Sequence, residues 1–196
     1  MPGTNLTRDE AATRAALLDV TSYAIDLDLT TGEKTFGSTT TIRFTCTQPG
    51  AETFADLVGA TVHEILLNGR PLDPATVYAD SRIALPDLAA DNELVVRADC
   101  TYSRTGEGLH RFVDPADDRV YLYSQFEVPD ARRVFTTFEQ PDLKAPFTFT
   151  VTAPSHWKVV SNSPTPEPDP VAEGVAVWRF APTKPISTHI TPIVAG

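Results

Sequence analysis

Alternating apolar and polar positions recur along most of the chain, and a period of two is typical of strands with one buried face. The segments that we expect to be strands are 23–29, 42–46, 62–67, 94–100, 147–153, 159–160 and 175–180. Asn68-Gly69 follows the third of them and predicts a tight hairpin, because both residues tolerate positive φ. Short strands with few helical segments predict an all-β fold, in which antiparallel sheets pack as a sandwich or saddle.

Only the N-terminal region carries a clear helix signal. Thr7 and Glu10 have the spacing of a capping box, and an Ala-rich run follows them. We therefore expect a short N-terminal helix in an arm formed by residues 1–19, outside the main sheet. Residues 20–196 are expected to form one all-β domain. Between residues 164 and 170, Pro at alternate positions predicts a stiff loop, because Pro cannot donate a ladder hydrogen bond.

Composition narrows the class of protein. The formal charge of -10 argues against a nucleic-acid partner, because phosphate contacts need a positive surface. Cys46 and Cys100 occupy apolar positions of expected strands, so we interpret them as buried thiols and not as a disulfide framework. The sequence shows no long apolar run and no secretory leader, which predicts no membrane partner and a cytoplasmic location.

The stretch from Val120 onward has an unusual polar face for a strand. Alternation divides it into two faces, with Val120, Leu122, Ser124 and Phe126 on one and Tyr121, Tyr123, Gln125 and Glu127 on the other. Pro129 cannot donate to a ladder, so we expect the strand to end near it. Asp130 then has the position of an N-cap for a short helical turn over residues 131–134. Gln125 and Glu127 are expected to present polar groups at the rim of a sheet.

Without a family resemblance, the sequence predicts neither a catalytic residue nor a metal site in this chain. His63-Glu64 begins like the zinc motif H-E-x-x-H, but position 67 is Leu and the segment is an expected strand. The sequence also lacks the nucleophile motif G-x-S-x-G. Taken alone, Glu127 is best explained by an ion pair with Arg132 or Arg133, or by a cap of the next turn. One of these arginines is expected to hold Glu139 or Asp142 and fix the turn.

Several motifs resemble those of a known family. They are S-Q-F-E at 124–127, D-A-R-R at 130–133, F-E-Q-P-D-L-K-A-P-F at 138–147, G-L-H-R-F at 108–112, S-N-S-P at 161–164 and T-K-P-I-S-T at 183–188. The first three, in order, resemble the block T-Q-x-E … A-R … F-D-E-P-x-x-K-A-x-F in the N-terminal domain of zinc aminopeptidases of the aminopeptidase N family. The other three are flanking motifs that agree with the same family. The resemblance covers nearly the whole chain beyond its first twenty residues.

This resemblance implies a function for the longer enzyme. Such an enzyme removes N-terminal amino acids from peptides, with zinc held by H-E-x-x-H and a distal Glu in a catalytic domain expected after Gly196. The resemblance implies that Glu127 helps to hold the substrate's free amino group, together with a Glu of a G-x-M-E-N motif in that domain. Gln125 would line the pocket for the first side chain. The partners are then peptide N-termini and the enzyme's own catalytic domain, and the isolated fragment is expected to bind no zinc and to be inactive.

The chain departs from the family pattern at a few positions. Ser124 stands where the family usually has Thr, Thr137 where many members have Cys, and Glu139-Gln140 where Asp-Glu is commoner. These changes lie in or near the turn and put its local hydrogen bonding in question more than the fold. A non-catalytic β-sandwich module for binding, or a scaffold without a peptidase, remains the alternative function. A glycosidase with Glu127 and Glu139 as its acid and nucleophile has no independent support.

Overall fold

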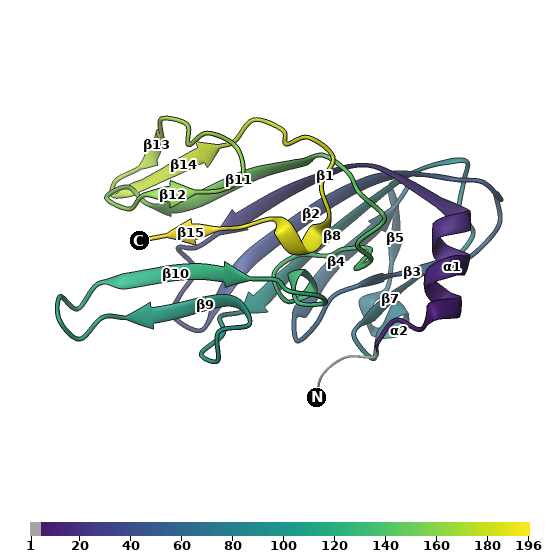
Figure 1. Ribbon diagram of the computed structural model, residues 1–196, viewed down its shortest axis with the longest axis horizontal. Coiled ribbons are helices and arrows are strands. Elements are labelled where there is room, and N and C mark those ends of the chain that lie inside the picture. Colours follow the sequence, from purple (N-terminus) through teal and green to yellow (C-terminus); the bar gives the residue numbers. More distant parts are fainter. Residues whose placement is uncertain (1–4) are drawn as a thin grey trace.

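The computed structural model describes residues 5–196, and strands dominate it (Figure 1). The largest sheet has eight strands, in the spatial order β13 (Asp169–Ala172), β14 (Val175–Arg179), β11 (Phe147–Pro154), β1 (Leu18–Asp28), β2 (Thr35–Cys46), β8 (Asp91–Thr101), β4 (Thr61–Leu67) and β5 (Arg70–Leu72). A four-stranded sheet has the order β12 (Val159–Val160), β15 (Val194–Ala195), β10 (Val120–Gln125) and β9 (Gly108–Val113). A three-stranded sheet has the order β3 (Thr53–Asp56), β7 (Arg82–Leu85) and β6 (Tyr78–Ala79).

Helical elements are few and short. They are the helices α1 (Arg8–Leu17) and α2 (Pro74–Val77) and the single 3-10 turns η1 (Ala131–Arg133) and η2 (Thr188–Ile190). The all-β fold with a short N-terminal helix is therefore confirmed. Within residues 5–196, no helix combines the length and the apolar character needed to cross a membrane.

The four-stranded sheet lies over one face of the eight-stranded sheet, and buried side chains of both belong to one core (Figure 1). Alternation places these side chains as predicted: Tyr23, Ile25 and Leu27 of β1 are each 1% exposed. Leu122 of β10 is buried to the same extent on the facing layer. Two sheets that cover each other's apolar faces form a sandwich, because neither face is then left in water.

One strand pair differs from the predicted antiparallel pattern. β1 and β11 are parallel, with Tyr23 opposite Phe147, whereas every other pair of named strands in the described chain is antiparallel. The rings of Tyr23 and Phe147 stack at 4.5 Å with an interplanar angle of 2°. Phe135 approaches Phe147 and Phe149 edge-on beside them. This aromatic cluster joins β1 to β11 within the core.

The hairpin and the cysteines have the predicted structure, whereas the proline-rich loop is shorter than predicted. The hairpin between β4 and β5 is confirmed, with φ of 55° at Asn68 and 76° at Gly69. Cys46 and Cys100 are buried free thiols, as expected. The loop expected over residues 164–170 was extended too far, because Pro170 lies in β13. β13 is an edge strand, where a residue without an N–H is tolerated.

α1 lies beside the sheets and begins with the predicted capping box. The Thr7 hydroxyl accepts a hydrogen bond from the Glu10 N–H, and the Glu10 carboxylate accepts one from the Thr7 N–H. Arg14, near the other end of α1, is only 2% exposed. Its guanidinium ties α1 to the rest of the domain through Asp56 and Gln140.

Candidate functional site

The strand expected to present Gln125 lies inside the four-stranded sheet, between β15 and β9. Leu122 is buried, whereas Tyr121, Tyr123 and Gln125 are exposed, so the two predicted faces are confirmed over β10. Opposite Gln125, β9 contributes Gly108, which has no side chain. The stem of Arg133 packs on Gly108, so Arg133 lies beside the strand position that pairs with Gln125.

β10 ends sooner than the alternation predicted. Phe126 is buried and follows the last paired residue, and Glu127 stands in the turn formed by residues 127–130. Glu127 is thus exposed because of the turn, and not because it continues the strand. The structure nevertheless leaves both predicted site residues, Gln125 and Glu127, at the surface within two positions of each other.

The turn is closed by Arg133 and not by a cap. Asp130 occupies the N-cap position of η1, but its side chain makes no capping hydrogen bond, so this prediction was wrong. The Asp130 carboxylate instead binds the Arg133 Nε at 2.6 Å. Arg133 also reaches Glu107, in the loop before β9, with its Nη2 at 3.2 Å from the Glu107 Oε2. Asp130 binds Arg133 because an ion pair is available to it three residues along.

The environment of Glu127 differs from the ion pair or cap that the sequence predicted without the family resemblance. In the described chain Glu127 pairs with neither Arg132 nor Arg133, and it does not cap η1. Arg133 binds Asp130 and Glu107 instead. Within the described part of the chain, no hydrogen bond or ion pair engages the side chain of Glu127 or of Gln125. A carboxylate and an amide with unused acceptors therefore stand together at this rim.

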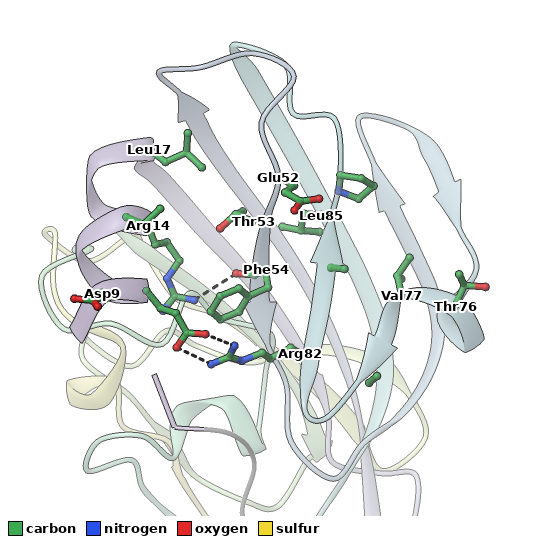
Figure 2. Close-up of a pocket in the computed structure, with 15 residues that line it drawn as sticks. Asp9, Arg14, Leu17, Glu52, Thr53, Phe54, Thr76, Val77, Arg82 and Leu85 are labelled. Carbon is green, nitrogen blue, oxygen red and sulfur yellow. Dashed lines mark hydrogen bonds and ion pairs between the residues drawn. The ribbon is translucent and has the colours of Figure 1, made fainter. Parts of the chain in front are cut away.

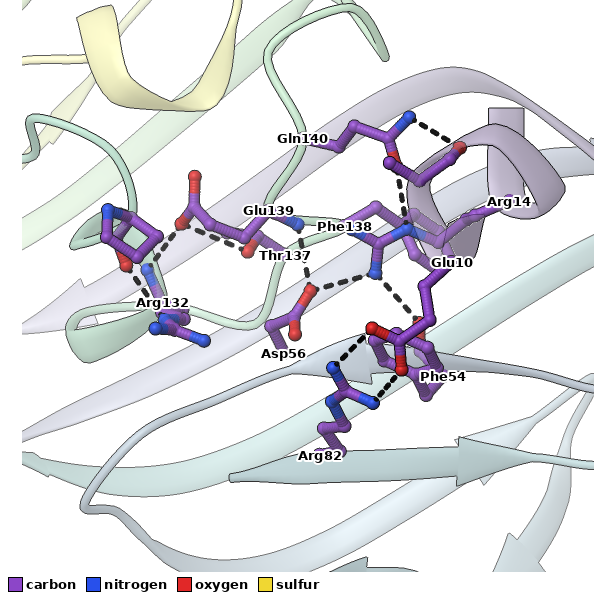
Figure 3. A network of polar contacts seen from close by, with 12 residues as sticks. Glu10, Arg14, Phe54, Asp56, Arg82, Arg132, Thr137, Phe138, Glu139 and Gln140 are labelled. Carbon is purple, nitrogen blue, oxygen red and sulfur yellow. Dashed lines mark hydrogen bonds and ion pairs between the residues drawn. The ribbon is translucent and has the colours of Figure 1, made fainter. Parts of the chain in front are cut away.

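Beneath the turn, Glu139 is buried and fully engaged (Figure 3). Its carboxylate accepts hydrogen bonds from the Arg132 backbone N–H at 2.9 Å, from the Thr137 hydroxyl at 3.3 Å and from the Thr188 hydroxyl. Burial, the largest influence, raises the pKa of Glu139. Arg132 contacts Glu139 through its backbone N–H, whereas the prediction was that an arginine side chain would hold Glu139 or Asp142. Glu139 is structural, which leaves the glycosidase pair without a second exposed carboxylate.

The network continues from Glu139 to α1 (Figure 3). The Glu139 N–H donates to the Asp56 Oδ2 at 3.0 Å, and the same oxygen pairs with the Arg14 Nη1 at 2.9 Å. The Arg14 Nε donates to the Gln140 Oε1 at 3.1 Å. The F-E-Q-P motif therefore fixes the base of the turn to α1 and β3, which explains why these polar residues lie in the core.

A metal site needs several ligand side chains close together. Residues 5–196 contain no group of three or more His, Cys, Asp or Glu side chains arranged to hold a metal ion. His63 lies on β4, and its Nε2 is 2.9 Å from the Asp99 Oδ2 on β8. That partner supports the interpretation of His63 as a strand residue.

The outer face of the four-stranded sheet is apolar and aromatic beside Gln125. Five of its side chains are between 38% and 49% exposed: Phe112, Tyr121, Tyr123, Val160 and Val194. Strand register aligns them, with Tyr123 opposite His110 and Val194, and Val194 opposite Val160. A contiguous exposed apolar surface of this kind is typical of an interaction site. Sequence reasoning noticed the two tyrosines but missed the other three residues, which come from other strands.

A separate groove of about 690 Å³ lies between α1 and the three-stranded sheet (Figure 2). Phe54, Val77 and Leu85 supply much of its apolar wall. The Arg82 guanidinium lies 4.0 Å from the centre of the Phe54 ring and pairs with Glu10 at 2.6 Å. Neither predicted site residue lines this groove. Its walls come from distant segments, so no local sequence signal predicted it.

Comparison with known proteins identifies the family to which this chain belongs. The family model of the Peptidase M1 N-terminal domain matches residues 20–190, and the chain belongs to this family. The chain is 61% identical over 199 residues to Aminopeptidase N of Streptomyces lividans, an alignment that covers 100% of this chain and 23% of that protein. The family expected from the motifs is therefore confirmed.

More distant relatives are aminopeptidases as well. Aminopeptidase M1-D of Oryza sativa subsp. japonica is 33% identical over 128 residues, covering 62% of this chain and 14% of that protein. Probable aminopeptidase 1 of Saccharolobus solfataricus is 33% identical over 79 residues, covering 40% of this chain and 10% of that protein. The chain thus spans less than a quarter of the length of these relatives.

Proposed function

We propose that this chain is the substrate-cleft domain of a zinc-dependent aminopeptidase that removes N-terminal amino acids from peptides in the cytoplasm. One observation carries the proposal: Gln125 and Glu127 stand exposed at the end of β10, in a chain that is 61% identical to an Aminopeptidase N. The residues described here do not fit a zinc site. The zinc ligands of the enzyme would therefore belong to another part of the protein, and no step at the metal is derived from this chain.

The chemistry of the rim suits a free amino terminus. An ammonium group that leaves water needs a compensating anion, and a charge-assisted hydrogen bond to a carboxylate is among the stronger ones. Glu127 supplies that carboxylate without first breaking an internal ion pair. Internal peptide bonds carry no charge, so the same carboxylate favours chain ends over chain interiors. Gln125, two residues earlier, provides amide contacts for the first side chain.

The outer face of the four-stranded sheet supports the expected partner. Its exposed side chains include Tyr121 and Tyr123, which precede Gln125 on the same strand. We propose that the enzyme's own catalytic domain covers this face. Association there would place Gln125 and Glu127 at the border between the two domains, where a cleft for the substrate would form.

The test uses the full-length enzyme with a peptide substrate. Loss of one charge-assisted hydrogen bond is worth about 1.5–3 kcal/mol, so Glu127→Ala is expected to raise KM about 10- to 100-fold while zinc content stays unchanged. Gln125→Ala should change the preference for the first side chain more than the overall affinity. Glu173→Ala is the matched control, because Glu173 is an exposed carboxylate in the turn between β13 and β14. Equal KM values for the Glu127→Ala and Glu173→Ala enzymes would contradict the proposal.

The isolated 196-residue chain provides a second test. It is expected to bind no zinc and to show no peptidase activity. Stoichiometric zinc together with peptide cleavage by the purified chain would overturn the proposal that zinc and catalysis belong to another part of the protein. A protein that lacks peptidase activity at full length would instead favour the non-catalytic binding or scaffold module.

A further inference from the structure

Arg133 joins the turn after β10 to the loop before β9. Its Nε lies 2.6 Å from the Asp130 Oδ1, and its Nη2 lies 3.2 Å from the Glu107 Oε2. Its backbone N–H donates to the Asp130 carbonyl at 3.1 Å. The side chain of Arg133 is 33% exposed and that of Asp130 15%, so this pair is less screened by water than a fully exposed one.

The stem of Arg133 packs directly on Gly108. Gly108 adopts a φ of 65°, and a Cβ built on it would lie 3.0 Å from the Arg133 Cβ and 3.2 Å from its Cδ. Any side chain at position 108 would therefore push Arg133 away. Gly108 is also the residue of β9 that lies opposite Gln125. Arg133 thus contacts the strand position that pairs with Gln125, and it binds Asp130 of the turn that contains Glu127.

The loop that Arg133 reaches is itself anchored to the outer face. The Gly106 N–H donates to the His110 Nδ1 at 3.1 Å. The His110 ring lies 4.9 Å from the Tyr123 ring, on the strand that carries Gln125. One end of the loop is therefore held by β9 and β10, and Glu107 connects it to Arg133. Without the Arg133 charge, the two ion pairs that tie Glu107 and Asp130 to this junction would be lost.

We propose that Arg133 is a positioning residue, which holds the turn of residues 127–130 against the loop before β9 and so sets where Glu127 stands relative to Gln125. The proposal rests on the proposed function, because its effect is exerted on the affinity for a free amino terminus. Arg133 does not itself touch the substrate. Two carboxylates, those of Asp130 and Glu107, already engage its guanidinium.

The experiment measures KM and kcat of the full-length enzyme with Arg133→Met, which keeps the length of the stem but removes the charge and all donors. KM is expected to rise about tenfold with kcat within a factor of two, since the contact made by Glu127 is weakened and not removed. Arg133→Lys keeps one charge but not the fork of donors and should give an intermediate KM. Arg119→Met is the control, because Arg119 is an arginine of the β9–β10 hairpin with a side chain that is 77% exposed.

A double mutant separates positioning from a general structural role. If Arg133 acts through Glu127, Arg133→Met should add no further rise in KM to the Glu127→Ala enzyme. Additive effects of the two changes would overturn the inference, and so would an unchanged KM for Arg133→Met when Glu127→Ala raises it. An unchanged KM for Glu127→Ala would instead remove the proposed function itself, and the inference with it. If Arg133→Met fails to fold, Glu107→Gln tests the same ion pair from the exposed carboxylate. Glu107→Gln is expected to raise KM as well, and an unchanged KM would count against the inference.

Discussion

Removal of the Arg14 charge should destabilise the domain far more than removal of an exposed arginine. Arg14 pairs with Asp56 at 2.9 Å, and their side chains are only 1% and 3% exposed. The guanidinium also lies over the ring of Phe54, 4.8 Å from its centre, and near that of Phe138 at 5.8 Å. Arg14→Met keeps an apolar stem in this space but leaves the Asp56 carboxylate buried without a counter-ion.

The magnitude follows from desolvation. Breaking a buried ion pair by removing one partner costs about 3–5 kcal/mol, because the remaining charge is left without compensation. For a domain of this size each kcal/mol lowers Tm by about 2–4 °C, so the expected decrease is about 6–20 °C. Arg43 provides the control: its pair with Glu93 is shorter, at 2.7 Å, but the side chains are 59% and 44% exposed. Arg43→Met should therefore cost at most about 1 kcal/mol.

Urea unfolding of the 196-residue chain at pH 7 measures both variants, with thermal unfolding as a second readout. The double variant Arg14→Met/Asp56→Asn removes both charges and keeps an acceptor for the Glu139 N–H. It should be more stable than Arg14→Met alone, since the uncompensated charge is gone. Equal losses for Arg14→Met and Arg43→Met, or a double variant as unstable as the sum of its single changes, would refute the reasoning.

Three further predictions concern stability. Phe135→Ala removes a fully buried ring that contacts three other phenylalanines, and should cost about 3–5 kcal/mol in urea unfolding. The hydrogen bond from Arg82 lowers the pKa of Glu10 from 4.5 to about 2, so its contribution is present above pH 4.5 and lost as pH falls towards 2. The stability difference between the native chain and Glu10→Gln should shrink over this range, and a constant difference would contradict the assignment. Burial raises the pKa of Glu139, so the folded state binds the Glu139 proton more tightly than the unfolded state does. The free energy of unfolding should therefore decline as pH rises above 4.5, the ordinary pKa of the group. The Glu139→Gln variant should lack this part of the pH dependence.

Much of the strand pattern could be predicted from the sequence, because alternation is a local property of the backbone. A strand places successive side chains on opposite faces, so the run from Tyr23 to Leu27 and that from Phe147 to Val151 reveal their buried faces without any knowledge of partners. The Asn68-Gly69 turn and the capping box at Thr7 are equally local, since each depends on residues within a few positions. The motifs around Gln125 and Glu127 were sufficient to find the family for the same reason.

Partners and directions were decided by the tertiary structure alone. Alternation contains no information on whether β1 meets β11 in parallel, because the two strands are more than a hundred residues apart and their pairing depends on the whole core. Local spacing suggested that Asp130 would cap η1, whereas Asp130 binds Arg133. Arg133 is also held by Glu107 and packs on Gly108, which are far away in the sequence, so these contacts of Arg133 were not visible from local spacing. Alternation located Gln125 on the exposed face of β10, while contacts between distant segments decided which neighbours surround Glu127 and left its carboxylate free of internal partners within the described residues.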